Sequence, residues 1–211
     1  SNVPLECLFV KGLPCSAIKT IDTGAKPRSL SDIMEIDHQK NYKYSTHIAA
    51  AIKFINGFEN GVYSSQTNHK YSRKNKLTSV EFLNWVKQNP KIIDFVGETM
   101  RLRSDGDKLI KASVFSGMKW ILDKHNKVES DKFFQRLSDG IGLEKMSPIY
   151  AFRKRIMAAS FSVEAKKYKM SQAQMVVSIV KTWNSYLDGT RVKVFKVQNE
   201  MQKIKTIKKL S

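Results

Sequence analysis

Apolar side chains recur every three or four residues along most of the chain between Ile48 and Leu187. This spacing places them on one face of an α-helix and differs from the alternation of a half-buried strand. We therefore predict a mainly α fold: a helical bundle of about eight helices with at most a minor β element at the amino terminus.

Capping residues and prolines predict where several helices begin and end. Thr78-Ser79-Val80-Glu81 has the spacing of a capping box, and Asn89-Pro90 ends one helix and begins the next. Ser171 is expected to cap a last helix that carries Trp183 on its buried face. The principal helices expected are 29–36, 42–58, 78–89, 90–103, 107–124, 130–137, a long helix from 147, and 171–187.

The amino-terminal segment favours a different structure. Leu5–Val10 is a short apolar run closed by Gly12 and Pro14, which indicates one buried strand. The backbone of a single strand needs a partner. A second strand near 192–197, a longer α/β unit, or a second copy of the chain in a dimer could supply it. We divide the chain into residues 1–28 (strand and connector), 29–190 (helical domain) and 191–211 (a mobile basic tail).

The chain is strongly basic. Its 37 Lys and Arg residues against 19 Asp and Glu give a formal charge of +18 and a pI of about 9.9. Such an excess attracts polyanions, and nucleic acid is the commonest of them inside cells. A lysine-rich solvated surface without a ligand is the plainer interpretation.

Other features limit location and chemistry. No apolar run reaches the length of a membrane span, no signal peptide is recognised, and Cys7 and Cys15 are expected to be reduced thiols rather than one disulfide. We expect a cytoplasmic protein associated with nucleoid, phage or plasmid DNA. The four histidines lack ligand spacing, and no phosphate-binding or nucleophile motif occurs. The sequence therefore predicts no enzyme, no metal and no cofactor.

Basic residues cluster at several places and are the candidate nucleic-acid-binding residues. Clusters that include tyrosine can grip phosphates and stack on bases, although each alone is also typical of a solvated face. The candidates are Lys70, Arg73, Lys74, Lys76, Arg101, Arg103, Arg153, Lys154, Arg155, Lys166, Lys167, Lys169, Arg191 and Lys193. Two helix pairs, 78–103 and 152–187, could form a helix-turn-helix, but packed helical hairpins share this pattern.

Three stretches resemble a family. Val3-Pro4-Leu5 to Asp32-Ile33, Phe133 to Arg155, and Lys181 to Val194 resemble bacterial and phage proteins that carry an amino-terminal ParB/sulfiredoxin-like domain followed by a helical region. The resemblance implies that the chain covers the last strand of that domain plus the helical region, and the sequence lacks the D-G-Q-H-R-type motif. The resemblance implies a DNA-associated protein of a bacterium, plasmid or phage.

We therefore expect a DNA-binding protein that grips the backbone largely without sequence preference. The alternative is a protein-interaction module, inhibitor or assembly factor that docks on an acidic protein partner. An enzyme whose site is assembled only in the fold is a third reading. We expect no membrane partner.

Overall fold

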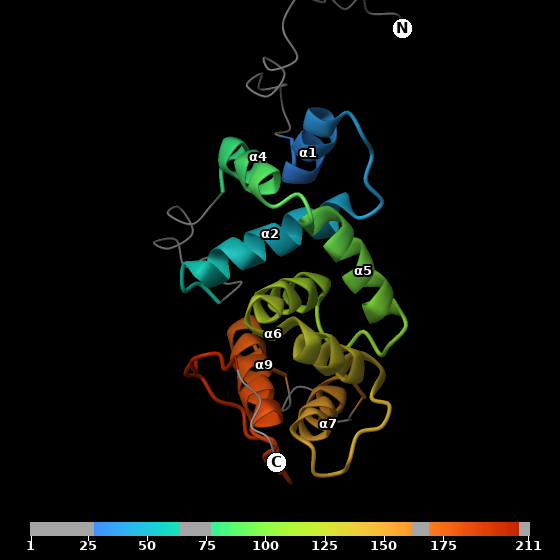
Figure 1. Ribbon diagram of the computed structural model, residues 1–211, viewed down its shortest axis with the longest axis vertical. Helices are drawn as coiled ribbons and strands as arrows, with labels where there is room; N and C mark the ends of the chain where they lie inside the picture. Colours follow the sequence, from blue (N-terminus) through green and yellow to red (C-terminus); the bar gives the residue numbers. More distant parts are fainter. Residues whose placement is uncertain (1–27, 64–76, 162–168, 207–211) are drawn as a thin grey trace, which may run out of the picture.

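The computed structural model describes residues 28–63, 77–161 and 169–206, and these residues confirm the mainly α fold. Seven helices are present there, and none of these residues forms a strand (Figure 1). The predicted strand at Leu5–Val10 lies outside the described residues. The helices are α1 (Leu30–His38), α2 (Ser45–Glu59), α4 (Ser79–Gln88), α5 (Ile92–Ser104), α6 (Ala112–Asp139), α7 (Pro148–Phe161) and α9 (Gln172–Leu187).

Side-chain caps fix the amino termini of α1, α4 and α9. Ser29, Thr78 and Ser171 each accept a hydrogen bond from the third residue of the helix that follows. The side chains of those third residues bond back to the cap backbone, which completes a capping box in each case. The boundaries expected at Thr78 and Ser171 are thus confirmed.

Helix α6 consists of two helical halves that meet at Asn126, within the break predicted between residues 124 and 130. The backbone of Asn126 is non-helical there (φ −163°, ψ 96°), and its side-chain Oδ1 accepts a hydrogen bond from Glu129 N at 3.1 Å. This contact caps the second half of the helix. The predicted start at Asp107 is wrong: α6 begins at Ala112, and Lys108 before it has a left-handed backbone conformation (φ 52°).

Two apolar clusters form the core, and α2 contributes to both. One cluster lies among α1, α2, α4 and α5, and the other among α6, α7 and α9 (Figure 1). Phe54 of α2 belongs to the second cluster. It lies so close to Gly117 of α6 that a Cβ at Gly117 would be 2.2 Å from the Phe54 ring. Glycine at this position therefore allows α2 and α6 to pack closely.

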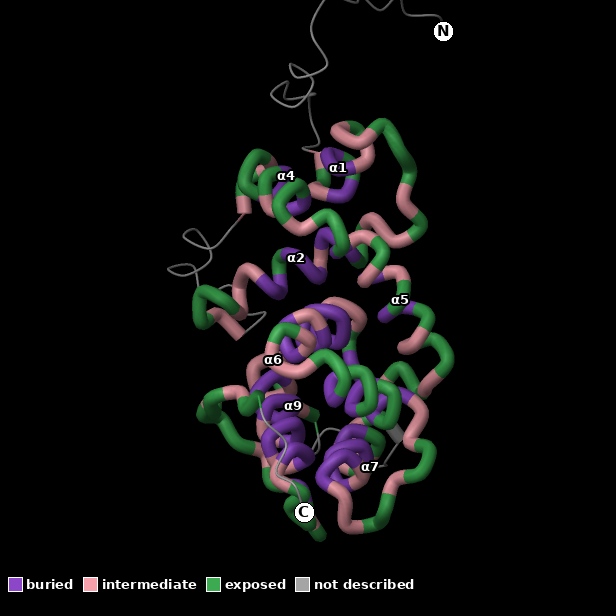
Figure 2. The backbone as a smooth tube through the Cα atoms, viewed as in Figure 1, coloured by how far each residue is buried: buried purple, intermediate pink, exposed green. Residues whose placement is uncertain are grey.

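Helix α9 lies in the centre of the second cluster. Every residue from Val176 to Val180 is buried, and Trp183 is 0% exposed, which confirms its predicted burial. The Trp183 ring lies edge-on to Phe133 with centroids 5.5 Å apart. Figure 2 shows the buried backbone concentrated on α9 and on the parts of α6 and α7 near it.

The segment after α9 packs against the helix, so the prediction of a mobile tail from residue 191 is wrong up to residue 206. Trp183 Nε1 donates to Lys205 O at 2.9 Å, and Asn184 bonds to the backbone of both Lys203 and Lys205. Phe195 is buried against Phe152 of α7. Polar side chains on α9 thus satisfy the backbone of an irregular segment.

Candidate nucleic-acid interface

Eight of the fourteen candidate basic residues lie in the described part of the chain. Those outside it are Lys70, Arg73, Lys74, Lys76, Lys166 and Lys167. Among the eight, Arg101, Lys154, Lys169, Arg191 and Lys193 are exposed, whereas Arg103, Arg153 and Arg155 are partly or fully buried. Arg101 belongs to α5, and the other four exposed residues belong to α7 or to the segments beside α9.

Arg153 is structural, which corrects its assignment to the interface. Its side chain is buried, and its guanidinium donates to the carbonyls of Leu137 and Ser138 at the end of α6 and pairs with Asp107. A cation at this position neutralises the negative end of the α6 dipole. Gly140 ends α6 with φ +73°, and a Cβ there would lie 2.7 Å from the Arg153 guanidinium.

The three basic residues 153–155, predicted to form one cluster, therefore point in different directions from α7. Successive residues of an α-helix point about 100° apart. Arg153 faces the core, Arg155 is half-buried, and Lys154 alone is exposed. The sequence held a signal for this, because Arg153 stands four residues after Ile149 and three before Ile156, on the apolar face of α7.

The side chain of Arg103 also forms structural hydrogen bonds to the backbone. Its Nε donates to Ile110 O at 2.7 Å, and an Nη donates to Lys108 O at 3.4 Å. Burial lowers the pKa of Arg103, but a guanidinium stays charged at neutral pH. The side chain therefore fixes the turn before α6, and its assignment to the interface is corrected as well.

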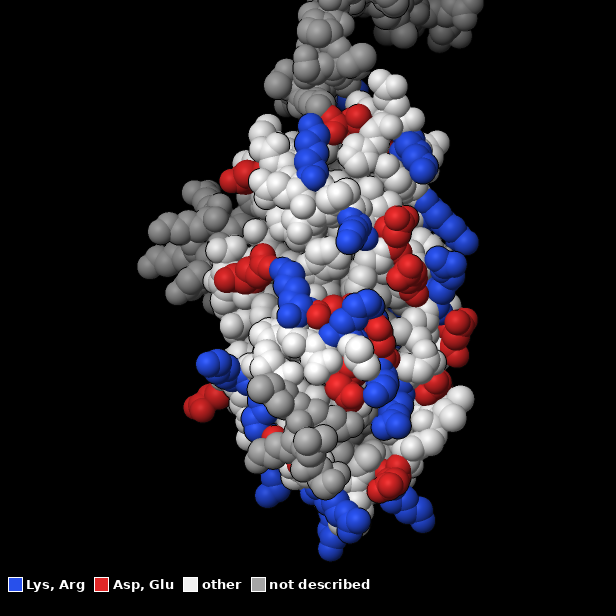
Figure 3. Space-filling model, in the orientation of Figure 1, with Lys and Arg blue, Asp and Glu red and all other residues white. Residues whose placement is uncertain are grey.

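Net charge is concentrated in the last third of the described chain. Residues 28–63 hold four Lys and Arg and four acids, and residues 77–139 hold eleven against nine. In contrast, residues 140–161 and 169–206 together hold eleven against three. Figure 3 agrees: red and blue side chains alternate over the middle of the visible face, whereas several blue ones protrude at its lower end.

In the middle of the molecule, lysines and acids pair with one another. Lys119 of α6 is buried, lies 3.0 Å from Asp123 and also pairs with Asp131; Lys127 lies 3.0 Å from Asp131. Burial alone would raise the pKa of Asp131, but the hydrogen bonds and charges of Lys119 and Lys127 lower it. The acids that the fold brings together here balance two lysines across the bend of α6.

The segment after α9 frames a groove of about 360 Å³ that no single stretch of sequence revealed. Its walls are the second half of α9, residues 190–196 and Pro148, the first residue of α7. Four basic residues line it: Lys181, Arg191, Lys193 and Lys196. No Asp or Glu is among the lining residues. Lys181 was missed, although it is the one charged residue in the apolar run of α9.

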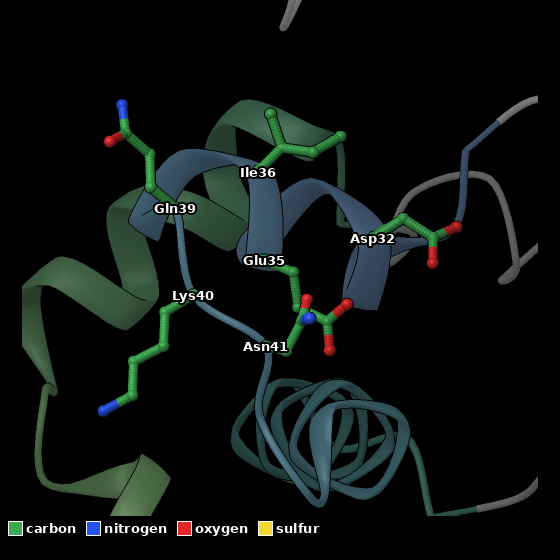
Figure 4. Close-up of a pocket in the computed structure, with 6 residues that line it drawn as sticks. All are labelled: Asp32, Glu35, Ile36, Gln39, Lys40 and Asn41. Carbon is green, nitrogen blue, oxygen red and sulfur yellow. The ribbon is translucent and has the colours of Figure 1, made fainter.

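A second hollow, of about 280 Å³, lies beside the end of α1 and is a weaker candidate for a binding site. Six residues between positions 32 and 41 line it, among them the acids Asp32 and Glu35 and one lysine. In Figure 4 the side chains of Glu35 and Asn41 point toward one another, whereas those of Ile36, Gln39 and Lys40 point away in different directions. Its polar groups do not converge on one point.

Neither predicted helix-turn-helix presents a reading helix. In α5 the first residue, Ile92, is 0% exposed and packs in the core. In α9 the buried run from Val176 to Leu187 leaves little surface that could enter a groove of DNA. A recognition helix needs exposed side chains near its amino end. Helices α7 and α9 pack against one another, whereas α4 and α5 contribute to the core cluster around α2.

The described residues contain neither a candidate metal site nor a candidate membrane span. No three of their His, Cys, Asp or Glu residues are grouped so that they could hold a metal ion. None of their helices is both long and apolar enough to cross a membrane.

Fold and charge together define a helical protein with a basic carboxy-terminal region. In comparisons with family models, curated proteins and solved structures, nothing matches this chain. The resemblance to ParB/sulfiredoxin-like proteins with a helical region therefore stays a prediction.

Proposed function

We propose that this protein binds the phosphate backbone of DNA, largely without sequence preference, through its carboxy-terminal third. The surface concerned, which we name the C-terminal basic surface, comprises Lys145, Lys154, Lys169, Arg191, Lys193, Lys196 and Lys203, all of them exposed. The observation that carries the proposal is the concentration of unbalanced positive charge there. Lysine is a point charge without the rigid fork that reads guanine, so its contacts favour phosphates over base edges.

The pairing of lysines elsewhere supports this assignment. Lys87, Lys124, Lys127 and Lys132 each lie within 4.0 Å of a carboxylate in the first two thirds of the chain. For the seven residues of the C-terminal basic surface, the described residues provide no such ion pair. Lys205, which pairs with Asp188 at the end of α9, is excluded from the surface for that reason.

The test compares two triple variants that remove equal charge. One replaces Lys154, Lys169 and Lys203 with Gln, and its control replaces Lys40, Lys43 and Lys53; all six lysines are exposed. Each phosphate contact contributes about 0.9 to the slope of log K against log salt. The first variant should weaken duplex binding and flatten that slope by about 2–3, whereas the control should bind like the parent. Equal duplex affinities and equal salt slopes for the two variants would contradict the proposal.

A second candidate function rests on exposed apolar side chains. Ile141 and Val194 are 74% and 73% exposed, and they lie on two segments joined by the hydrogen bond from Val192 N to Met146 O at 2.8 Å. Apolar groups beside lysines suit an acidic protein partner. Such docking would depend less steeply on salt than backbone binding does, and it would be lost on replacing Ile141 and Val194 with Ser.

A further inference from the structure

Residues 190–196 carry three of the four cations of the groove on an anchored backbone. Val192 N donates to Met146 O, and the Phe195 ring is buried against Phe152 of α7, so the segment is anchored one residue before and two residues after Lys193. On the facing wall, the Lys181 ammonium donates a hydrogen bond to Lys196 O at 2.9 Å and lies 5.5 Å from the centre of the Phe195 ring. The Lys181 ammonium is therefore positioned before any ligand arrives.

The charges in this groove are uncompensated. Burial, and then the positive charge of Lys196, lower the pKa of Lys181, and no Asp or Glu is among the residues that line the groove. Arg191 and Lys193 complete the lining with two more cations. Pro148 adds the first turn of α7, where the helix dipole is positive. An anion bound here would remove repulsion among groups that the fold already holds together.

We propose that the groove binds a phosphomonoester, and that its source is the terminal phosphate of a nucleic-acid strand. The choice of a strand end as source rests on the proposed function. A phosphodiester carries one negative charge, whereas a phosphomonoester carries about −1.5 to −2 at neutral pH and offers three acceptor oxygens. Four cations that line one groove favour the more highly charged group. A volume of about 360 Å³ is near the lower end for small-ligand sites, so a strand end fits and a duplex does not.

The experiment measures binding of two single-stranded oligonucleotides of one sequence, one with a 5′-phosphate and one with a 5′-hydroxyl. We expect the parent protein to bind the phosphorylated strand about tenfold more tightly, as one strong charge-assisted contact allows. Lys181→Gln and, separately, Lys193→Gln should abolish this preference. Lys53→Gln, on α2, should leave it unchanged. Lys193 is exposed, so its variant tests the groove even if Lys181→Gln disturbs the fold.

Two further probes separate this inference from the proposed function. Closed circular duplex has no strand ends, so it tests backbone binding alone. Inorganic phosphate should raise the melting temperature of the parent more than chloride at equal ionic strength, and should not do so for Lys193→Gln. If circular duplex binds but the two oligonucleotides bind equally, the groove inference is overturned and the function stands. If phosphate stabilises the parent alone and no nucleic acid binds, the groove takes free phosphate, and both the strand end as source and the proposed function fail.

Discussion

Arg153 joins three parts of the molecule at one point. Its guanidinium bonds to two carbonyls at the end of α6 and to Asp107 in the turn before α6, and its backbone belongs to α7. Losing it would leave Leu137 O without this donor, at a cost of about 1–3 kcal/mol, and would leave Ser138 O with Asp107 N alone. We expect Arg153→Ala to lower the free energy of unfolding by about 2–4 kcal/mol, measured by urea denaturation.

The neighbouring Lys154 is a matched control, because it is exposed on the same turn of α7. Lys154→Ala should change stability by less than about 0.5 kcal/mol and should weaken DNA binding. Arg153→Ala should bind DNA like the parent once corrected for its folded fraction. If Arg153→Ala weakened DNA binding but left stability unchanged, and Lys154→Ala did the opposite, Arg153 would belong to the DNA interface.

Tyr186 predicts a dependence of stability on alkaline pH. Its hydroxyl donates to Glu129 Oε2 at 2.5 Å; burial first, then this hydrogen bond and the charge of Glu129, raise the pKa of Tyr186 far above the usual value of about 10. A raised folded-state pKa gives stability that is complete below pH 10 and is lost above it, because the unfolded state then loses its proton more readily.

The measurement is urea denaturation of the parent and of Tyr186→Phe at neutral pH and above about pH 10. At neutral pH the variant should be less stable by about 1–2 kcal/mol, because the buried Glu129 carboxylate loses a donor. Above pH 10 this difference should shrink. A difference that stays constant with pH would show that Tyr186 ionises alike in both states.

At the scale of elements, the closest helix contact described is that between α2 and α6. Gly117→Ala would drive a methyl into the Phe54 ring and should destabilise the protein by about 1–3 kcal/mol. Gly97, inside α5, is the control: a Cβ there would meet only the Tyr44 ring at 3.9 Å. Gly97→Ala should stabilise the protein by about 0.5–1 kcal/mol through helix propensity. Thermal or urea unfolding that moved both variants in the same direction would contradict this packing.

The elements also show what could be predicted from sequence. Helices with an apolar stripe and a local cap, such as α4 and α9, were predicted closely, because both signals lie within the element. The two halves of α6, which meet at the non-helical Asn126, were also predicted as separate helices, although the first was expected to begin at Asp107. The burial of Arg153 could have been predicted from its place on the apolar face of α7. Its partners, those of Lys181 and the packing of residues 191–206 involve residues distant in sequence, so local patterns could not reveal them.

At the scale of the whole molecule, charge is distributed unevenly over two core clusters. The first two thirds of the described chain have nearly equal numbers of basic and acidic residues, and α2 contributes to both clusters, to one of them through Phe54. The carboxy-terminal part, which packs around α9, carries the excess of positive charge. A rigid helical frame that presents unpaired lysines suits binding to a uniform array of phosphates better than reading of bases.

The most direct test of this account is the salt dependence of binding to two unrelated duplexes of equal length. With five to seven phosphates contacted, log K should fall against log salt with a slope of roughly −4 to −6. Affinity and slope should be the same for both duplexes. A slope near zero, or strong binding to one duplex only, would contradict the account.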